Sequence, residues 1–116
     1  MKIAHIRKTA EFREILSGGR KWQERTVALH SREAGDRDKV YIGTIITKKL
    51  APKATQRNYI RRVIYGFFID NKQMLTGGTK NIVRLRRDIR DVKKRTLSKG
   101  IREEVQKMAR KAGVMQ

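Results

Sequence analysis

The sequence predicts a single α+β domain in which helices pack on a small central sheet. The first observation is the order of its patterns, which read helix, two or three strands, helix, strand, helix. The second is that a chain of 116 residues shows no internal repeat and no long linker. The third is a hydrophobic content of 38%, lean but sufficient for one core. We therefore expect one domain over residues 9–116, preceded by a basic arm at residues 1–8.

The first half of the chain shows one helical pattern followed by strand patterns. Phe12, Ile15 and Leu16 share one face of a helix. Thr9 is a suitable N-cap, and the glycines at 18–19 end the helix. Beyond them the period changes to two, which is typical of strands. The expected elements are strands at about 20–31 and at 40–47, separated by a polar turn at 33–39.

The second half contains a helix, a strand and a last helix. The only proline, Pro52, lies in a basic loop before the first of these helices, where its missing N–H costs little. Gly113 is suited to cap the last helix. The expected elements are a helix that fades at 72–75, a turn at 76–78, a strand at 81–86, a charged connector at 86–95 and a helix at 98–112, whose buried line is Leu97, Ile101, Val105, Met108 and Ala112.

Residues 48–69 carry the clearest functional signal. One side of this helix is apolar and comprises Ile60, Val63, Ile64, Phe67 and Phe68. The opposite side and its approach comprise Asn58, Arg61, Arg62 and Tyr65, with Arg57 at the edge and Lys48, Lys49 and Lys53 leading in. A solvated helix face usually mixes charges of both signs, whereas this one meets no acidic residue before Asp70. Burial of the apolar side would hold the guanidinium groups outward, which suits a phosphate backbone.

The overall charge supports a polyanionic partner. Thirty Lys and Arg against eleven Asp and Glu give a formal net charge of +19, spread along the chain. A membrane surface is the competing polyanion, but the sequence shows no signal peptide, no lipidation motif and no apolar run near the length of a membrane span. The absence of cysteine excludes disulfides, thiolate zinc sites and cysteine nucleophiles, and fits a reducing cytosol.

The sequence offers no enzyme site of its own. Its two histidines, His5 and His30, lack the spacing of a metal site or a catalytic triad. Asp36 and Asp38 lie in a polar turn, where such a pair is usually only part of the turn. The glutamates at 103–104 are spaced to pair with basic residues along the last helix and so to support it. Any part in catalysis should therefore consist of holding an RNA.

The run over residues 46–62 resembles the signature of the bacterial ribonuclease P protein family. In that family a strand ending in Ser-Lys-Lys leads through a basic loop to a helix that opens Arg-Asn-Arg-x-Lys-Arg. Here the strand ends Thr47-Lys48-Lys49, and the helix opens Arg57-Asn58-Tyr59-Ile60-Arg61-Arg62. The first helix, the strand before Arg86-Arg87 and the last helix also fall where the family has them, so the resemblance covers nearly the whole chain.

The resemblance implies an αβββαβα order with a left-handed βαβ crossover, in a fold like that of the second domain of a small-subunit ribosomal protein. It implies the non-catalytic protein subunit of ribonuclease P, the endoribonuclease that removes the 5′ leader of precursor tRNA by phosphodiester hydrolysis. The catalytic centre then belongs to the RNA subunit and its bound Mg2+. The expected partners are ribonuclease P RNA and precursor tRNA, with no membrane, no obligate protein partner and a cytoplasmic location.

Two sets of contacts follow from the resemblance by position. Those expected to bind the RNA subunit are Lys48, Lys49, Lys53, Arg57, Asn58, Arg61, Arg62 and Tyr65. Those expected to bind the precursor leader, in a cleft between the first helix and the sheet, are Phe12, Leu16, His30, Arg86 and Arg87. Phe12 matches an aromatic position at which a ring stacks on an unpaired base. Its helical face with Ile15 and Leu16 fits a core position equally well.

Several positions depart from the family pattern. Leu16 stands where relatives often have Phe, and His30 where they often have Tyr, so weaker stacking on the leader is expected. Tyr59 replaces the third residue of the Arg-Asn-Arg run. Tyr65-Gly66 stands where Arg-Glu is common, and a glycine inside a helix costs roughly 1 kcal/mol against alanine.

The alternative from another class is a structural RNA-binding protein, such as a small ribosomal protein with no part in tRNA processing. Composition and the charged helix fit that class equally well, and only the run at 46–62 in its strand-loop-helix setting separates the two. A sequence-specific DNA binder would need a helix-turn-helix, and the expected strands argue against one. A nuclease made of protein alone would need a carboxylate cluster that the sequence lacks.

Overall fold

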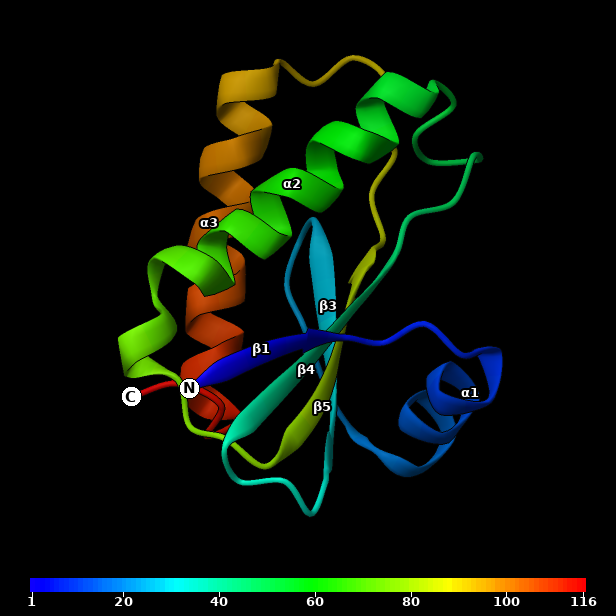
Figure 1. The fold of residues 1–116 in the computed structure, drawn as a ribbon. Coiled ribbons are helices and arrows are strands. Elements are labelled where there is room, and N and C mark those ends of the chain that lie inside the picture. The colour runs from blue at the N-terminus through cyan, green and yellow to red at the C-terminus, as the bar shows by residue number, and fades with distance from the viewer.

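The computed structural model describes all residues from 1 to 116 and confirms a small α+β domain (Figure 1). Its elements are β1 (Lys2–His5), α1 (Thr9–Gly18), β2 (Arg20–Gln23), β3 (Val27–Glu33), β4 (Lys39–Ile45), α2 (Ala54–Asp70), the short 3-10 helix η1 (Lys72–Met74), β5 (Thr79–Leu85) and α3 (Lys94–Lys111). From α1 onward the helices and strands follow the expected order. None of the helices has the length and apolar character needed to cross a bilayer.

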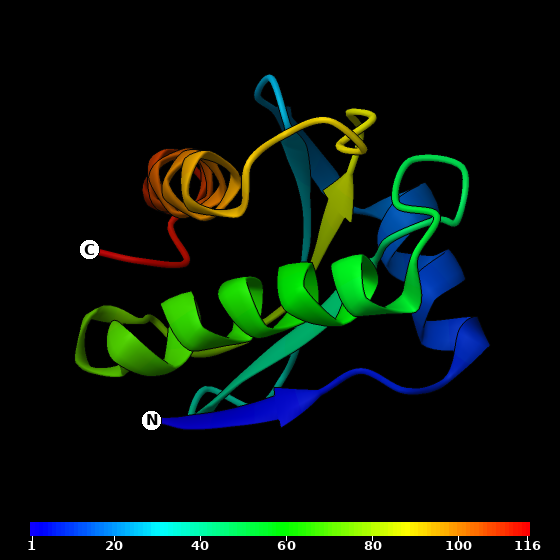
Figure 2. The ribbon, with the colours of Figure 1, turned by 90° about the horizontal axis from the view of Figure 1, so that it is seen from above.

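The strands form one mixed sheet in the order β1-β4-β5-β3-β2. Strands β1, β4 and β5 run parallel, and β3 and β2 continue the sheet antiparallel. Helix α2 connects the parallel neighbours β4 and β5, and this crossover is left-handed, as the family resemblance implied (Figures 1 and 2). Nearly all such crossovers in proteins are right-handed, so residue periodicity alone could not have indicated this feature.

Helices α2 and α3 cover one face of the sheet and α1 lies on the other (Figures 1 and 2). The main core lies on the α2 and α3 side and contains 22 buried residues. A smaller cluster of Ile6, Ile15 and Ile82 lies on the α1 side, with Phe12 and Tyr41 packed against it. The sheet therefore has one thickly covered face and one face that only a short helix covers.

Helix α2 is anchored as its periodicity predicted. All of its expected apolar residues are buried in the main core. At its start, the side chain of Gln56 accepts the Lys53 N–H at 3.1 Å, which satisfies one of the groups that a helix terminus leaves free. At its end, Asn71 Nδ2 donates to the Phe67 carbonyl at 2.8 Å. Both ends are thus fixed, and the polar side of α2 must face outward.

The structure corrects three boundaries. Residues 1–8, expected as a basic arm outside the domain, begin instead with edge strand β1, which pairs with β4. The region at 20–31, expected as one strand, is the hairpin of β2 and β3. The last helix begins at Lys94, so the connector at 86–95 ends earlier than expected. Gly113 follows that helix with a φ of 75°, as a helix-ending glycine should.

Candidate RNA-binding surfaces

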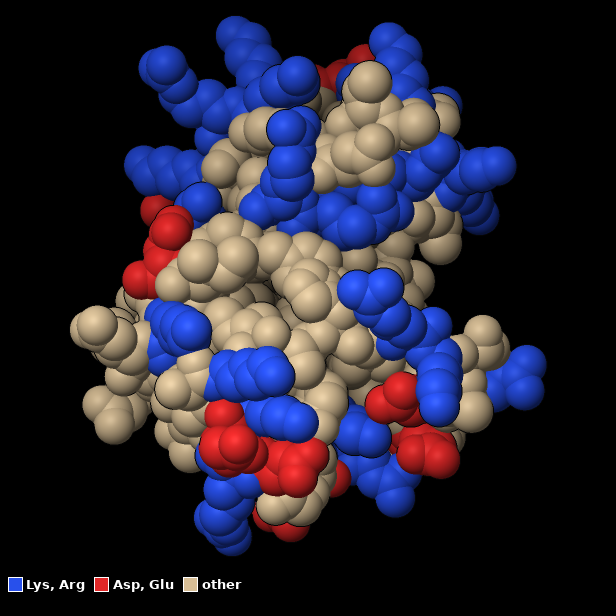
Figure 3. All heavy atoms as spheres, in the orientation of Figure 1, with Lys and Arg blue, Asp and Glu red and all other residues tan.

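The outward side of α2 and the loop before it form a cationic surface, which we call the α2 surface. It consists of the residues expected to bind the RNA subunit: Lys48, Lys49, Lys53, Arg57, Asn58, Arg61, Arg62 and Tyr65. The three lysines are exposed, as are Asn58 and Arg62, while the remaining three are half-buried. Figure 3 shows Lys and Arg crowding the part of the molecule formed by α2 and the start of α3, with the larger acidic groups in the lower half of the view.

Two of the arginines on this surface make hydrogen bonds within the chain. Arg57 Nη1 donates to the carbonyls of Ala51 and Pro52, at 3.0 and 2.9 Å, and so holds the basic loop against the helix. Arg61 Nη1 donates to Asn58 Oδ1 at 2.7 Å. A guanidinium has five N–H donors, so each of these groups keeps donors for a phosphate while its position is fixed.

Tyr65 lies at the edge of the α2 surface and also packs inward. Its hydroxyl donates to the Ile42 carbonyl at 3.3 Å, and its ring lies 4.6 Å from that of His5, centroid to centroid. Burial raises the pKa of Tyr65, so the phenol stays protonated as a donor. His5, Tyr65 and three polar residues of α2 line an open hollow, so the ring is close to the surface without projecting from it.

On the other face of the sheet, Phe12 lies against β4. An added Cβ at Gly43 would come within 3.0 Å of two ring carbons of Phe12, so the ring rests directly on the strand backbone. The ring is half-buried against Ile6 and Ile15, so it packs partly as a core residue and keeps part of its surface accessible. Leu16, by contrast, is 39% exposed one turn further along α1.

His30 is buried on the α1 side of β3, next to β5. Arg84 Nε donates to His30 Nε2 at 3.3 Å, which identifies that ring nitrogen as an acceptor. Burial, with the nearby charges of Arg84 and Lys21, lowers the pKa of His30. The imidazole is therefore neutral at physiological pH, and the cation presented at this position belongs to Arg84.

Arg86 and Arg87 lie just beyond the end of β5. The Arg86 guanidinium donates to the Glu24 carbonyl, and its own N–H donates to the Thr26 carbonyl at 2.9 Å. Arg86 thus holds the turn of the β2–β3 hairpin, while Arg87 is half-buried. No hydrogen bond or ion pair connects either arginine to Phe12, Leu16 or His30.

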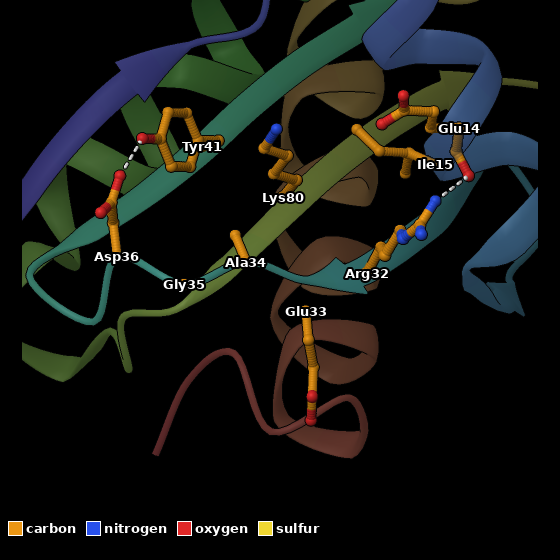
Figure 4. Close-up of a pocket in the computed structure, with 9 residues that line it drawn as sticks. All are labelled: Glu14, Ile15, Arg32, Glu33, Ala34, Gly35, Asp36, Tyr41 and Lys80. Atoms are coloured by element: carbon orange, nitrogen blue, oxygen red, sulfur yellow. Dashed lines mark hydrogen bonds between the residues drawn. The ribbon is translucent and has the colours of Figure 1, made fainter.

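The structure adds residues to the α1 side that sequence reasoning missed. Tyr41 shares the sheet face of Gly43, its hydroxyl donates to Asp36 Oδ2 at 2.6 Å, and this bond raises the pKa of Tyr41 (Figure 4). Lys80 Nζ lies 5.5 Å from the Tyr41 ring centroid and 3.2 Å from Glu11 Oε2. Period two along β4 already placed Tyr41 and Gly43 on one face, but the run at 40–47 reads as buried on both faces.

A pocket opens beside these residues, between α1 and the β3–β4 turn (Figure 4). Arg32 lines it and donates to the Glu14 carbonyl at 3.2 Å, which links β3 to α1. Tyr41 and Lys80 line the pocket with Arg32, and Phe12, His30 and Arg84 lie outside its lining on the same side of the sheet; we call this set of residues the α1 groove. No three His, Cys, Asp or Glu side chains in the chain lie close enough to share a metal ion. The groove offers rings and cations for binding.

Comparison with known proteins gives consistent matches. Residues 1–112 match the family model described as Ribonuclease P. A ribonuclease P protein component from Nitrosomonas eutropha is 32% identical over 89 residues, which cover 76% of this chain and 73% of that protein. The same component from Nitrosomonas europaea is 35% identical over 72 residues, which cover 62% of this chain and 60% of the relative.

Solved structures with similar folds carry the same name. A Staphylococcus aureus RNase P protein, a mutant with defective mRNA degradation activity, superposes with a TM-score of 0.77 at 26% identity, covering 91% of this chain and 87% of that one. The RNase P protein from Thermotoga maritima gives a TM-score of 0.72 at 21% identity, with coverage of 89% and 96%. At that identity the second likeness concerns the fold alone.

Proposed function

The chain belongs to the ribonuclease P protein family, and from that premise we propose that it is the protein subunit that binds the RNA subunit of the enzyme through the α2 surface. One observation carries this proposal: a row of cations stands on a helix whose other side is entirely in the core. Because Arg57 and Arg61 are already held by internal hydrogen bonds, binding loses less side-chain freedom than it would with mobile arginines.

The chain then contributes binding and charge, and the RNA performs the chemistry. Phosphodiester hydrolysis belongs to the RNA subunit and its Mg2+ ions, as the family resemblance implies. The net charge of +19 reduces the repulsion between the catalytic RNA and precursor tRNA. Holding precursor tRNA against the catalytic RNA in the right position makes cleavage effectively unimolecular. The place of action is the cytoplasm, where bacterial tRNA precursors are made.

The 5′ leader of precursor tRNA lies in the α1 groove. Phe12 and Tyr41 supply rings for unpaired bases, and Arg84, Arg32 and Lys80 supply charge for the backbone. His30 is buried and neutral, so it shapes the groove and positions Arg84. Arg86 and Arg87 extend this cationic edge beyond β5.

A structural RNA-binding protein, such as a small ribosomal protein, remains the alternative on composition. Nothing in the charge or in the α2 surface distinguishes it from the proposed subunit. The family match over residues 1–112 favours the ribonuclease P subunit.

Reconstitution tests the proposal. The protein is added to a bacterial ribonuclease P RNA with 5′-labelled precursor tRNA at low Mg2+, where the RNA alone should be slow. We expect cleavage at the mature 5′ end only when both are present, with Arg61→Gln weakening RNA docking and Phe12→Ala weakening leader binding. Lys72→Gln, an exposed residue outside both surfaces, serves as the control. Absence of stimulation at any salt concentration would support the structural RNA-binding protein instead.

A further inference from the structure

A second cationic hollow lies between α2 and the first half of α3, beside the α2 surface. It is lined by Tyr59, Lys94, Arg95, Ser98, Lys99 and Arg102, and we call it the α3 hollow. No acidic residue is among its lining, and its two lysines and Arg95 are exposed. The expected RNA contacts do not include any of these residues.

Tyr59 joins the two helices at this hollow. Its hydroxyl donates to the Lys94 carbonyl at 3.1 Å, and its ring packs against the main core. The Lys94 ammonium lies 5.4 Å from the ring centroid, within the range of a cation–π contact. Tyr59 itself is uncharged, whereas Lys94 of α3 places a cation over its ring. The positive surface is therefore continuous across the aromatic residue.

The cations of the hollow are poorly compensated within the protein. Arg102 pairs with Asp70 at 3.3 Å, whereas Lys94, Arg95 and Lys99 take part in none of the ion pairs of the chain. Lys94 and Arg95 also stand in the first turn of α3, which has no acidic residue and no side-chain N-cap. The helix dipole disfavours cations at that end. A polyanion laid across the hollow would relieve this repulsion.

The two cationic surfaces adjoin at Gly66. Gly66 lies on the side of α2 that faces α3, where an added Cβ would stand 3.5 Å from Arg102 Nη2. That separation is an ordinary van der Waals contact, so the absence of a side chain at Gly66 leaves the guanidinium next to the backbone of α2. Arg62 is exposed on the same helix. In Figure 3 blue side chains crowd this upper part of the molecule on both helices.

We propose that the α3 hollow is a second phosphate-binding site for the catalytic RNA, and that the RNA backbone lies across α2 and α3 together. Residues 94–102 extend over about 12 Å of helix, roughly three nucleotide steps. Lys94, Arg95 and Lys99 are the phosphate contacts, and Tyr59 positions Lys94. This inference rests on the proposed function, because it takes the RNA subunit as the partner of α2.

The test compares two triple variants of equal charge. Lys94→Gln/Arg95→Gln/Lys99→Gln removes the exposed cations of the hollow. Lys2→Gln/Lys72→Gln/Lys111→Gln removes three exposed cations from β1, η1 and the last turn of α3. Affinity for ribonuclease P RNA and for precursor tRNA is measured separately across a salt series, after circular dichroism shows that both variants remain folded.

We expect the hollow variant to lose roughly ten- to hundredfold in affinity for ribonuclease P RNA at moderate salt. The slope of log affinity against log salt should decrease in magnitude by roughly 2–3, about 0.7–0.9 for each phosphate lost. The control triple should keep the wild-type slope. Equal losses of RNA affinity in both variants would overturn the site, because they would show that affinity depends on net charge and not on where the cations lie. A loss confined to precursor tRNA would overturn the assigned partner.

A rescue separates charge from packing. Tyr59→Arg in a Lys94→Gln background returns a cation to α2 beside the position of the lost Lys94 ammonium. We expect part of the lost affinity and slope to return, which a purely structural role for Lys94 would not allow. If wild-type protein binds the RNA and the hollow triple binds equally well, the hollow fails while the proposed function stands. If wild-type protein does not bind ribonuclease P RNA, the proposed function itself fails.

Discussion

Gly43 is the residue on which the position of Phe12 in the α1 groove depends. An alanine there would place its Cβ 3.0 Å from Cε1 and Cζ of Phe12 and 3.2 Å from Cβ of Ile6. These separations are shorter than ordinary van der Waals contact. Because Gly43 is buried in the middle of β4, the strand cannot retreat, and the ring must move instead.

The cost of Gly43→Ala can be estimated from these contacts. Inserting a methyl group into a packed site typically costs about 1–3 kcal/mol. The lower backbone freedom of alanine returns about 0.5–1 kcal/mol. The net loss of about 0–2.5 kcal/mol corresponds to a decrease in Tm of up to about 10 °C in a domain of this size. A displaced Phe12 ring should also weaken discrimination between precursor tRNA and mature tRNA, since only the former carries a leader.

Thermal unfolding by circular dichroism measures the first effect, and binding of the two tRNAs in reconstituted enzyme measures the second. Gly35→Ala is the matched control, because nothing lies within 4 Å of an added Cβ at Gly35. We expect it to keep the wild-type Tm and tRNA preference. If Gly43→Ala behaves like the control in both assays, then the position of the Phe12 ring does not depend on Gly43, and the contact that defines this part of the α1 groove is wrong.

Three further predictions concern stability. The pKa of His30 is lowered in the native state, so near the ordinary value of 6.5 the native state binds fewer protons than the unfolded state. The free energy of unfolding should therefore fall as pH decreases through 6.5. Urea unfolding should show that His30→Gln removes this pH dependence, and a variant with the wild-type pH profile would contradict the role of His30. Glu104→Ala should lower Tm by about 8–12 °C, for a loss of about 2–3 kcal/mol, because the Glu104 carboxylate accepts two backbone N–H groups at the start of β3, at 2.8 and 3.0 Å. Glu103→Ala changes an exposed neighbour and should leave Tm unchanged. Equal Tm shifts in the two variants would refute the role of the Glu104 carboxylate in holding β3. Tyr65→Phe removes the hydrogen bond to the Ile42 carbonyl and should lower the free energy of unfolding in urea by about 0.5–1.5 kcal/mol. Affinity for ribonuclease P RNA should change less than twofold. A large loss of affinity would show instead that the hydroxyl contacts the RNA.

The parts of the fold that the sequence predicted correctly depend on neighbours along the chain. The apolar side of α2 repeats every three or four residues, and all of it is buried. The glycine after α3 was equally predictable from the sequence, because the positive φ that ends a helix is a requirement of the local backbone. The charged side of α2 follows from the same periodicity, since a buried face determines which residues face outward.

Edge strand β1 escaped prediction because its partner is remote. Lys2–His5 pairs with β4 more than thirty residues later, and four residues without a clear period carry little signal of their own. The glutamates at 103–104 misled for a related reason. Their spacing suggests pairs along α3, but Glu104 reaches β3 and binds its backbone. Only the packing of α3 against the hairpin makes that acceptor available.

Residue type alone also could not separate the roles of the arginines. Arg57 and Arg62 belong to the same short run, yet Arg57 holds two loop carbonyls while Arg62 is exposed. The difference arises because the loop folds back over the first turn of α2, a contact that no helical periodicity describes.

The α1 groove shows where such local reasoning ends. Phe12 comes from α1, Tyr41 and Gly43 from β4, and Arg84 from β5, and only the tertiary fold brings them to one face. The resemblance predicted Phe12 and His30 as leader contacts because a family pattern carries positions, and that role stays a prediction. Tyr41 matched no such position, and the evenly apolar run around it concealed its face. The outward face of one helix can therefore be anticipated from periodicity, whereas a groove shared by α1 and three strands needs the coordinates.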